Sequence, residues 1–532
     1  MLALIIIIDN TFKQQIIYLC VLEYNLQITK IMKLKHFLFV MIVVAYPFEL
    51  KATDYYTAPK ATGNGTSIDS PMELTNALEK IAVGDHLYLL DGQYDLKYTL
   101  KINKSGTENN MIFISAYKDS KPILDFREEA YGSHGMDLNA DYVHIKGITL
   151  RYAGKQGFQN NGSHNIMELM DIYGNCDTGI QQKGGNSNLI LNCDSHDNFD
   201  YEKGGITAAD FGGNADGFGD KQYEASPGNT YVGCRSWNNA DDGWDFYQRI
   251  GGTTVFINCI CFQNGPSTFD LSNYPRLAID SVWFNQFSGD GITITDDNGK
   301  THKCSLKEYF NNGNGNGFKI GGANTKHDVL LFRCLSLGNT VKGFDQNSDA
   351  GKIQIYNCTS YANGSNFGFY NDNGYSMDIE NSISLDSKGA NSFKCSNLIT
   401  EYNTWNSGFS VNVSDFVSID TTKVLSTRNI DGSLADDNLL KLNSSSKLIG
   451  AGTDLTTKLA EVTNRGYNIG NTKDIGSFEY ISATAINKIK EDAKDCDIAS
   501  IYTINGIHTN NMSSKGLYII KYNSGKTIKT VK

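Results

Sequence analysis

The feature that most constrains the fold is a short pattern that recurs along the middle of the chain. A Cys or another small residue is followed by a Ser or Cys two positions later, and by an Asn or Ser five positions later. The copies are Cys193/Ser195/Asn198, Cys234/Ser236/Asn239, Cys259/Cys261/Asn264, Cys334/Ser336/Asn339, Cys358/Ser360/Asn363 and Ser382/Ser384/Ser387. Their first positions are 41, 25, 75, 24 and 24 residues apart, so the repeat is 24–25 residues long and two copies carry insertions.

A fixed period of this length, filled with short strands and turns, is typical of a solenoid. The composition agrees, because 52 Gly and only 7 Pro favour many short strands joined by turns. Each unit predicts one coil of three strands and three turns, stacked about 4.8 Å from the next coil. The sequence therefore predicts an all-β fold, a parallel β-helix of 24–25-residue coils.

Equivalent residues of successive coils stack in columns in such a fold. A column of Asn at a turn would form hydrogen bonds along the rod, and a column of Cys would be buried as small apolar residues. The chain has 11 Cys. Because the column accounts for five of them, we expect these to be free rather than paired in disulfides.

The N-terminal residues differ from the repeat. Residues 1–31 are interpreted as an extension upstream of the true start. Residues 32–52 are interpreted as a signal peptide, because a basic segment, Met32–Lys35, precedes a short apolar run. That run is too short for a membrane span, which needs about 20 residues, so we expect no stable membrane span after cleavage. An N-terminal membrane anchor is the alternative.

The remaining chain divides into a long repetitive domain, residues 53–482, and a small C-terminal β module, residues 483–532, with strands near 501–505 and 516–521. Near the start of the long domain, Ser70-Pro71-Met72-Glu73 predicts a short capping helix with Ser70 as its N-cap. A strand follows at 86–90. The C-terminal module resembles the sorting modules of secreted Bacteroidetes enzymes, which implies a secreted or cell-surface location, associated with the outer membrane of a Gram-negative cell.

A second column in the repeat consists of a Gly followed by an aromatic residue. Its members are Gly217-Phe218, Gly243-Trp244, Gly317-Phe318, Gly343-Phe344 and Gly368-Phe369. Alignment on this column places Asp216, Asp242 and Asn316 before the Gly, and Gly219, Asp245, Lys319, Asp345 and Tyr370 after the aromatic residue. The aromatic side chains, Trp244 included, are predicted to point into the core.

The step from Gly243 to Gly317 is 74 residues, which we interpret as one coil plus an insertion of residues 265–312. Asp245 and Lys319 would then be stacked neighbours. Strand alternation places Asp216, Asp242, Asp245 and Lys319 on one outer face, with Asp241 at the turn before. A solvated acidic stripe would account for any two of these carboxylates, but not for four that converge.

Clustered carboxylates suit Ca²⁺, which takes six to eight oxygen ligands. No His or Cys joins them, which argues against zinc. A lysine beside a dication favours its neutral amine and would serve as a Brønsted base. The formal net charge of −11 argues against a nucleic-acid partner.

Asp-Asp-Gly-Trp-Asp at 241–245 and Asn-Gly-Asn-Gly-Phe-Lys-Ile-Gly-Gly at 314–322, on this repeat, resemble the family 9 polysaccharide lyases. The resemblance covers roughly residues 54–480 and implies a right-handed parallel β-helix, whose entry cap the first helix and strand also resemble. It implies Ca²⁺ held by Asp216, Asp241, Asp242 and Asp245, with Lys319 as catalytic base. The implied substrate is an acidic plant polysaccharide, polygalacturonate or else rhamnogalacturonan, cleaved by β-elimination. The long insertion before the lysine departs from the family pattern and is expected to alter the cleft.

Three further cations lie near these residues in the sequence. Lys221, Arg235 and Arg249 are candidates for binding other uronates, although each also fits an ordinary surface charge. Two other functions stay open. A polygalacturonase-type hydrolase would use Asp241 and Asp242 as its carboxyl pair, and a non-catalytic rod would bind carbohydrate with structural Ca²⁺. We expect a monomer.

Overall fold

The structure is a computed structural model of the chain. It describes residues 52–200, 213–222, 227–265 and 315–481 in full, and outside these ranges the backbone of eight strands. The chain forms two compact units, residues 1–53 and residues 54–532. In the first unit, β1 (Leu2–Ile7) pairs antiparallel with β2 (Ile17–Leu22). The predicted signal peptide lies almost entirely outside the described residues.

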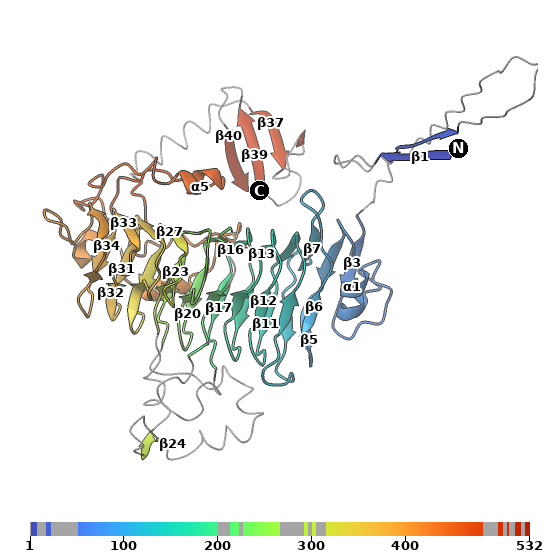
Figure 1. Ribbon diagram of the computed structural model, residues 1–532, viewed down its shortest axis with the longest axis horizontal. Coiled ribbons are helices and arrows are strands. Elements are labelled where there is room, and N and C mark those ends of the chain that lie inside the picture. The colour runs from blue at the N-terminus through green and yellow to red at the C-terminus, as the bar shows by residue number, and fades with distance from the viewer. Residues whose placement is uncertain are drawn as a thin grey trace, which may run out of the picture. The chain divides into compact units, whose positions relative to one another are not determined.

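Successive coils of the second unit lie side by side in Figure 1 and contribute their strands to three parallel sheets. The first sheet has 12 strands, and the second and third have 10 each. Their strand order follows the chain because each strand pairs with its equivalent one coil away. The predicted all-β parallel solenoid is thereby confirmed.

The strands of the first sheet are β3 (Asp54–Thr57), β4 (His86–Leu89), β7 (Ile112–Ala116), β10 (Val143–Lys146), β13 (Ile166–Glu168), β16 (Leu189–Leu191), β19 (Thr230–Val232), β22 (Thr253–Ile257), β27 (Asp328–Phe332), β30 (Lys352–Tyr356), β33 (Ser376–Glu380) and β36 (Asn397–Glu401). The second sheet contains β5 (Gly92–Asp95), β8 (Pro122–Asp125), β11 (Thr149–Arg151), β14 (Asp171–Tyr173), β17 (Asp194–His196), β20 (Arg235–Trp237), β23 (Ile260–Phe262), β28 (Leu335–Leu337), β31 (Thr359–Tyr361) and β34 (Ile383–Leu385). The third contains β6 (Leu100–Ile102), β9 (Met136–Leu138), β12 (Phe158–Asn160), β15 (Ile180–Gln182), β18 (Phe218–Asp220), β21 (Trp244–Asp245), β26 (Phe318–Lys319), β29 (Lys342–Asp345), β32 (Ser365–Phe369) and β35 (Ser392–Phe393).

The two predicted internal columns are confirmed. The five repeat cysteines are buried, and the eight cysteines within the described residues are all free thiols. Each Asn of the ladder donates its amide Nδ2 to the Oδ1 of the next, over 2.8–2.9 Å from Asn198 to Asn363. These bonds satisfy polar groups that would otherwise be buried without partners.

The aromatic residues of the other column stack inside the rod. Trp244 is fully buried, with its ring centroid 4.5 Å from that of Phe218 and 4.9 Å from that of Phe318. The last member of this column was predicted wrongly, because Phe344 pairs with Phe367 rather than with Phe369. In that coil the Asn ladder passes from Asn363 to Asn366, which occupies the place of the glycine. Asp345 therefore pairs with Gly368 and not with Tyr370.

The capping helix begins later than predicted. Helix α1 spans Leu74–Lys80, and Glu73 rather than Ser70 is its N-cap, accepting from the backbone N–H of Asn76. The preceding residues are extended instead, because Met72 donates its N–H to the carbonyl of Tyr56 over 2.9 Å. The predicted strand at 86–90 is confirmed as β4.

Residues 402–481 contain only short helices and pack back along the rod. These helices are η2 (Val413–Asp415), η3 (Thr421–Leu425) and α5 (Ala460–Asn464). Arg428 pairs with Asp194, Arg465 donates to the carbonyl of Thr253, and the Ser477 hydroxyl donates to the carbonyl of Cys334. This returning segment thus contacts coils that span much of the rod.

The second unit also contains two smaller antiparallel sheets. The insertion contributes an antiparallel pair, β24 (Ile292–Thr295) with β25 (Thr301–Cys304). The C-terminal module has the strand order β38 (His508–Thr509), β37 (Ile498–Thr503), β39 (Leu517–Tyr522) and β40 (Thr527–Val531), all antiparallel. Its sorting role stays a prediction. Among the described residues, no helix has the length and apolar character needed to cross a bilayer.

Candidate active site

The third sheet brings the predicted site residues onto neighbouring coils. Trp244 pairs with Phe318, and Asp245 pairs with Lys319, across the β21–β26 ladder. The β18–β21 and β26–β29 ladders continue the same register on either side. The insertion between β23 and β26 therefore leaves the coil register intact, and the predicted juxtaposition of Asp245 with Lys319 is confirmed.

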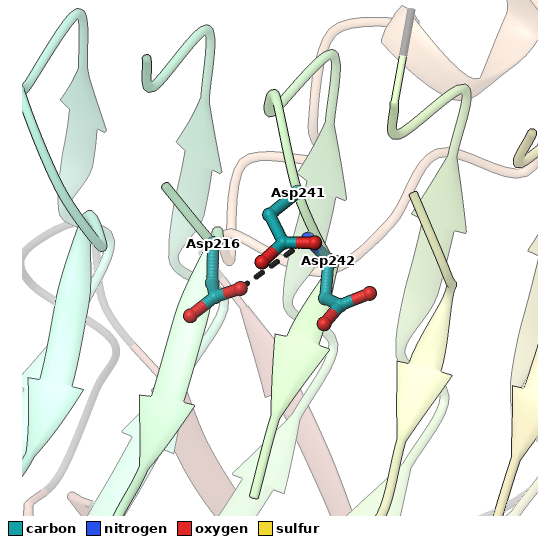
Figure 2. Close-up of side chains that lie close together, drawn as sticks. All are labelled: Asp216, Asp241 and Asp242. Atoms are coloured by element: carbon teal, nitrogen blue, oxygen red, sulfur yellow. Dashed lines mark hydrogen bonds between the residues drawn. The ribbon is translucent and has the colours of Figure 1, made fainter. Parts of the chain in front are cut away.

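Three carboxylates converge at the turns that lead into β18 and β21. Asp216 comes from one coil, and Asp241 and Asp242 come from the next, as Figure 2 shows. One ligand oxygen from each lies within 4.8 Å of the others, and all three residues are buried. Such convergence of oxygen ligands is the arrangement that a hard divalent cation requires.

Hydrogen bonds from adjacent coils fix the carboxylates. Asp242 Oδ1 accepts from the backbone N–H of Asn316 over 2.9 Å and from its amide Nδ2 over 2.8 Å. Asp216 Oδ1 accepts from the backbone N–H of Asp242 over 3.3 Å, and its Oδ2 accepts from the Thr178 hydroxyl over 3.0 Å. The site is thus held by the same stacking that builds the rod.

Two lysines face this cluster. Lys319 Nζ lies 2.8 Å from Asp242 Oδ2 and 3.3 Å from Asp245 Oδ1. Lys221 Nζ lies 2.9 Å from Asp216 Oδ2 and 2.7 Å from Asp245 Oδ2. Asp245 therefore joins the two lysines, beside the group formed by Asp216, Asp241 and Asp242.

Burial and mutual repulsion dominate the electrostatics of the carboxylates. Burial raises the pKa of Asp216 to about 7 and that of Asp242 to about 6, while Lys221 and Lys319 respectively oppose the shift. Burial, reinforced by Asp242, holds the pKa of Asp241 well above its usual value. Burial would raise the pKa of Asp245 as well, but the charges of Lys221 and Lys319 outweigh burial and lower the Asp245 pKa.

Lys319 is held as an ammonium by this surrounding charge. Its burial favours the neutral amine, but Asp242 and Asp245 outweigh that effect and hold the Lys319 pKa well above its ordinary value. The protonation state of Lys319 therefore depends on the charge carried by its carboxylate neighbours.

One oxygen indicates that the residues fit a cation. Among the described residues, Asp241 Oδ1 is buried without a hydrogen-bond partner. An orphaned buried carboxylate oxygen is costly, and a calcium ion would satisfy it. The three converging ligand groups are all carboxylates, which agrees with calcium rather than zinc.

The structure brings only one of the three additional cations to the cluster, namely Lys221. Arg235 lies on the second sheet, where its guanidinium makes a two-pronged pair with Asp194 at 2.9 and 2.7 Å. Arg249 is fully buried, 3.3 Å from Asp220. Neither arginine is positioned to contact a polymer bound over the carboxylates, because each is buried and paired with another carboxylate. Sequence proximity alone did not reveal which sheet or side each arginine faces.

The sequence reasoning missed Thr178 and Tyr247, and it placed Asn316 in the column before the glycines without giving it a role. Thr178 and Asn316 bind the carboxylates directly, and Tyr247, 45% exposed, donates its N–H to Asp245 Oδ1 over 3.0 Å. Thr178 precedes Gly179-Ile180, which continues the Gly-aromatic column with an aliphatic residue. A search for Gly followed by any apolar residue would have found it.

Comparison with known proteins places this chain in a family. A family model described as "Pel9A-like, right handed beta helix region" matches residues 55–276 and 284–391. Pectate lyase L of Dickeya dadantii is 32% identical over 443 residues, which are 80% of this chain and 90% of that protein. Pectate lyase L of Paenibacillus polymyxa is 33% identical over 434 residues, 76% of this chain and 84% of that protein.

Solved structures agree. The crystal structure of pectate lyase Pel9A aligns with a TM-score of 0.64 and 32% identity, covering 81% of this chain and 96% of that one. A rhamnogalacturonan lyase aligns with a TM-score of 0.57 at 22% identity, covering 74% and 97%, and shows a shared fold. With its right-handed parallel β-helix and the matches over most of its length, this chain belongs to the Pel9A-like family 9 polysaccharide lyases.

Proposed function

We propose that this enzyme is a calcium-dependent lyase of acidic pectic polysaccharides and that polygalacturonate is its preferred substrate. The relatives that exceed 30% identity over most of the chain carry the name pectate lyase. The similarity to a rhamnogalacturonan lyase is 22%, so rhamnogalacturonan is retained as a comparison substrate in the assay below.

The calcium ion would be held by Asp216, Asp241 and Asp242, with Asp245 beside them. The convergence of the first three within 4.8 Å and the unpartnered Asp241 Oδ1 support this assignment. When bound, the ion would neutralise the carboxylates that keep Lys319 protonated, and it would stabilise the charge that develops on a uronate carboxylate. Asn316 and Thr178 would keep the carboxylates oriented through their hydrogen bonds.

Lys319 would act as the base of a β-elimination. Its neutral Nζ takes the proton from C5 of the uronate, and the C5–H electron pair forms the C4–C5 double bond. The bond between C4 and the glycosidic oxygen breaks, and that oxygen leaves and acquires a proton from water. The leaving fragment, on the non-reducing side of the cleaved bond, keeps the glycosidic oxygen as its new reducing end, and the other fragment carries a 4,5-unsaturated uronate at its non-reducing end. Lys319 returns its proton to solvent before the next turnover.

The single observation that carries this proposal is the position of the Lys319 ammonium. Its Nζ is 2.8 Å from one carboxylate of the cluster, on the adjacent coil, and the side chain is 12% exposed. A base must lie within hydrogen-bond reach of the group that it serves. A substrate carboxylate anchored by the same cluster would present its neighbouring C5 proton to this lysine.

The test measures ultraviolet absorbance of the unsaturated product on polygalacturonate and on rhamnogalacturonan, with calcium and with chelator. We expect absorbance only with calcium. Lys319→Ala should lose about 10²- to 10⁴-fold in kcat while it keeps calcium binding, measured by calorimetry. Lys352→Ala, which removes an exposed lysine of the first sheet, is the matched control. New reducing ends without absorbance would instead indicate hydrolysis, and full activity of Lys319→Ala would exclude Lys319 as the base.

We further propose that the protein is secreted or displayed at the cell surface and acts as a monomer. The basic and apolar residues of 32–52 support export. N-terminal sequencing of protein recovered from a Gram-negative host should begin near Thr53, and light scattering should give one chain per particle. Retention of residues 32–52 on the recovered protein would contradict the export signal.

A further inference from the structure

The third sheet continues beyond Lys319 with polar residues in the same columns. Asp345 is the register partner of Lys319 on the following coil. Lys342 follows Asn316 in the column before the glycines, since Gly317 donates its N–H to the Lys342 carbonyl. These two residues therefore stand one coil, about 4.8 Å, farther along the same face. That distance is comparable with the length of one sugar unit in a polysaccharide.

Lys342, Asp345 and Tyr370 make a compact group on this coil and the next. Lys342 Nζ lies 3.0 Å from Asp345 Oδ1 and 5.3 Å from the centre of the Tyr370 ring. The Lys342 side chain is 23% exposed, and Tyr370 is 41% exposed. An ammonium and an aromatic ring are thus presented together to solvent.

The glycine at position 368 makes this arrangement possible. A Cβ added to Gly368 would lie 2.4 Å from Lys342 Cδ and 2.9 Å from Tyr370 Cε2. The aliphatic stem of Lys342 occupies the space that a side chain would fill. On the two preceding coils the equivalent positions carry the side chains of Lys319 and Asp345. Gly368 is therefore the first position after Lys319 in this column that carries no side chain.

We propose that Lys342, Asp345 and Tyr370 form a sugar-binding subsite for the same polysaccharide that Lys319 acts on. This inference rests on the proposed function. Asp345 compensates the charge of Lys342, so the ammonium keeps donors for hydroxyl oxygens without acting as an isolated cation. The Tyr370 ring offers an apolar surface with a polar edge, which suits the C–H face of a pyranose. The ligand class is one hexopyranose unit of the bound chain, recognised through its hydroxyls and ring face.

The subsite predicts how activity depends on chain length. Oligogalacturonates too short to reach it should be cleaved equally by the wild type and by variants of the subsite. Longer oligomers should lose roughly tenfold in kcat/KM when the ring or the ammonium is removed. The kcat at saturation should stay unchanged, because the subsite binds substrate without touching the reacting atoms.

The experiment compares Tyr370→Ala and Lys342→Ala with the wild type on oligomers of two to eight units. Tyr98→Ala is the control for the first, because Tyr98 is 53% exposed and precedes the strand at the opposite end of the same sheet. Lys352→Ala controls for the second. Circular dichroism and thermal unfolding check that each variant is folded.

A loss confined to the longer oligomers, absent from both controls, supports the subsite. Equal length dependence in variants and wild type would overturn it while leaving the lyase proposal intact. A wild type that releases no unsaturated product from any oligomer or polymer would refute the proposed function, and the subsite with it. Binding of the hexamer to Lys319→Ala, measured by calorimetry, gives a readout independent of turnover, and Tyr370→Ala in that background should weaken it by a similar factor.

Discussion

Replacement of Arg235 by alanine tests whether this arginine serves the substrate or the fold. Its guanidinium makes a two-pronged pair with Asp194 at 2.9 and 2.7 Å. It also donates to the carbonyl oxygens of Val424, at 2.7 Å, and Ser426, at 3.0 Å. The side chain is 9% exposed. These contacts join the second sheet to the returning segment of residues 402–481.

The expected cost follows from those contacts. Removal of one partner from a buried ion pair costs about 3–5 kcal/mol, because the other charge is left unpaired. Asp194 keeps a second partner in Arg428, whose Nε lies 3.3 Å from its Oδ2. Two carbonyls lose their donor, however, at about 1–3 kcal/mol each where water cannot replace it. We therefore expect Arg235→Ala to lose about 3 kcal/mol of unfolding free energy.

Thermal and urea unfolding of wild type and Arg235→Ala measure this loss, and the melting temperature should fall by on the order of 5 °C. Arg235→Lys should recover only part of it, because a lysine keeps the charge but lacks the planar fork. Below the transition, KM on polygalacturonate should match that of the wild type. A several-fold rise in KM with an unchanged melting temperature would refute the structural role and restore Arg235 to substrate binding.

Three further predictions concern the calcium site, the rod and pH. Asp241→Asn should raise the melting temperature in chelator, because a neutral amide replaces a carboxyl group whose ionisation is disfavoured by burial and by Asp242, which raise its pKa. The variant should also abolish the rise that calcium produces in the wild type, and a calcium-induced rise of wild-type size would contradict the ligand assignment. Gly243→Ala would bring a Cβ to 2.6 Å from the Gly317 carbonyl oxygen and should disturb the β21–β26 pairing and lower activity. Gly184→Ala should be tolerated, because the atom nearest to its added Cβ lies 3.3 Å away. Equal activities of the two variants would count against this reasoning. Burial opposes protonation of His196, but Asp171 and Asp197 outweigh it and raise the His196 pKa to about 9. The resulting stabilisation, at most roughly 3 kcal/mol, is complete below about pH 6.5 and is lost as pH rises through about 9. The difference in unfolding free energy between wild type and His196→Gln should therefore shrink over that range, and a difference that stayed constant from pH 6 to 10 would disprove this prediction.

Most of the fold could be predicted from the repeat, because the stacking of coils in a β-helix is periodic. The Cys and Asn columns define the coil length, and the Gly-aromatic column defines the register of the third sheet. Backbone pairing joins equivalent positions whatever the length of the loop between them. The adjacency of Asp245 and Lys319 was therefore predictable from spacing alone, across 74 residues of sequence.

The predicted register of the third sheet was wrong in one coil, where the spacing of the aromatic residues changes. Phe367 replaces Phe369 in the aromatic column because Asn366, and not a glycine, continues the ladder in that coil. The slip is confined to the third sheet, because Ser360 still pairs with Ser384 in the predicted register of the second sheet. A displacement of two residues keeps the side-chain alternation, so pattern analysis does not reveal it. The grouping of Lys342, Asp345 and Tyr370 became visible only through the observed pairing and Gly368.

The sequence by itself thus determined the solenoid, the core columns and the coils that carry the carboxylates and the lysine, because these follow from a period. Only the tertiary structure decided which cations face the site. Lys221 reaches Asp216 and Asp245, whereas Arg235 is occupied by Asp194 and the returning segment, and Arg249 is buried beside Asp220. A long cationic side chain pairs with whatever carboxylate the fold brings within reach, and a segment 189 residues away in the sequence can supply further partners.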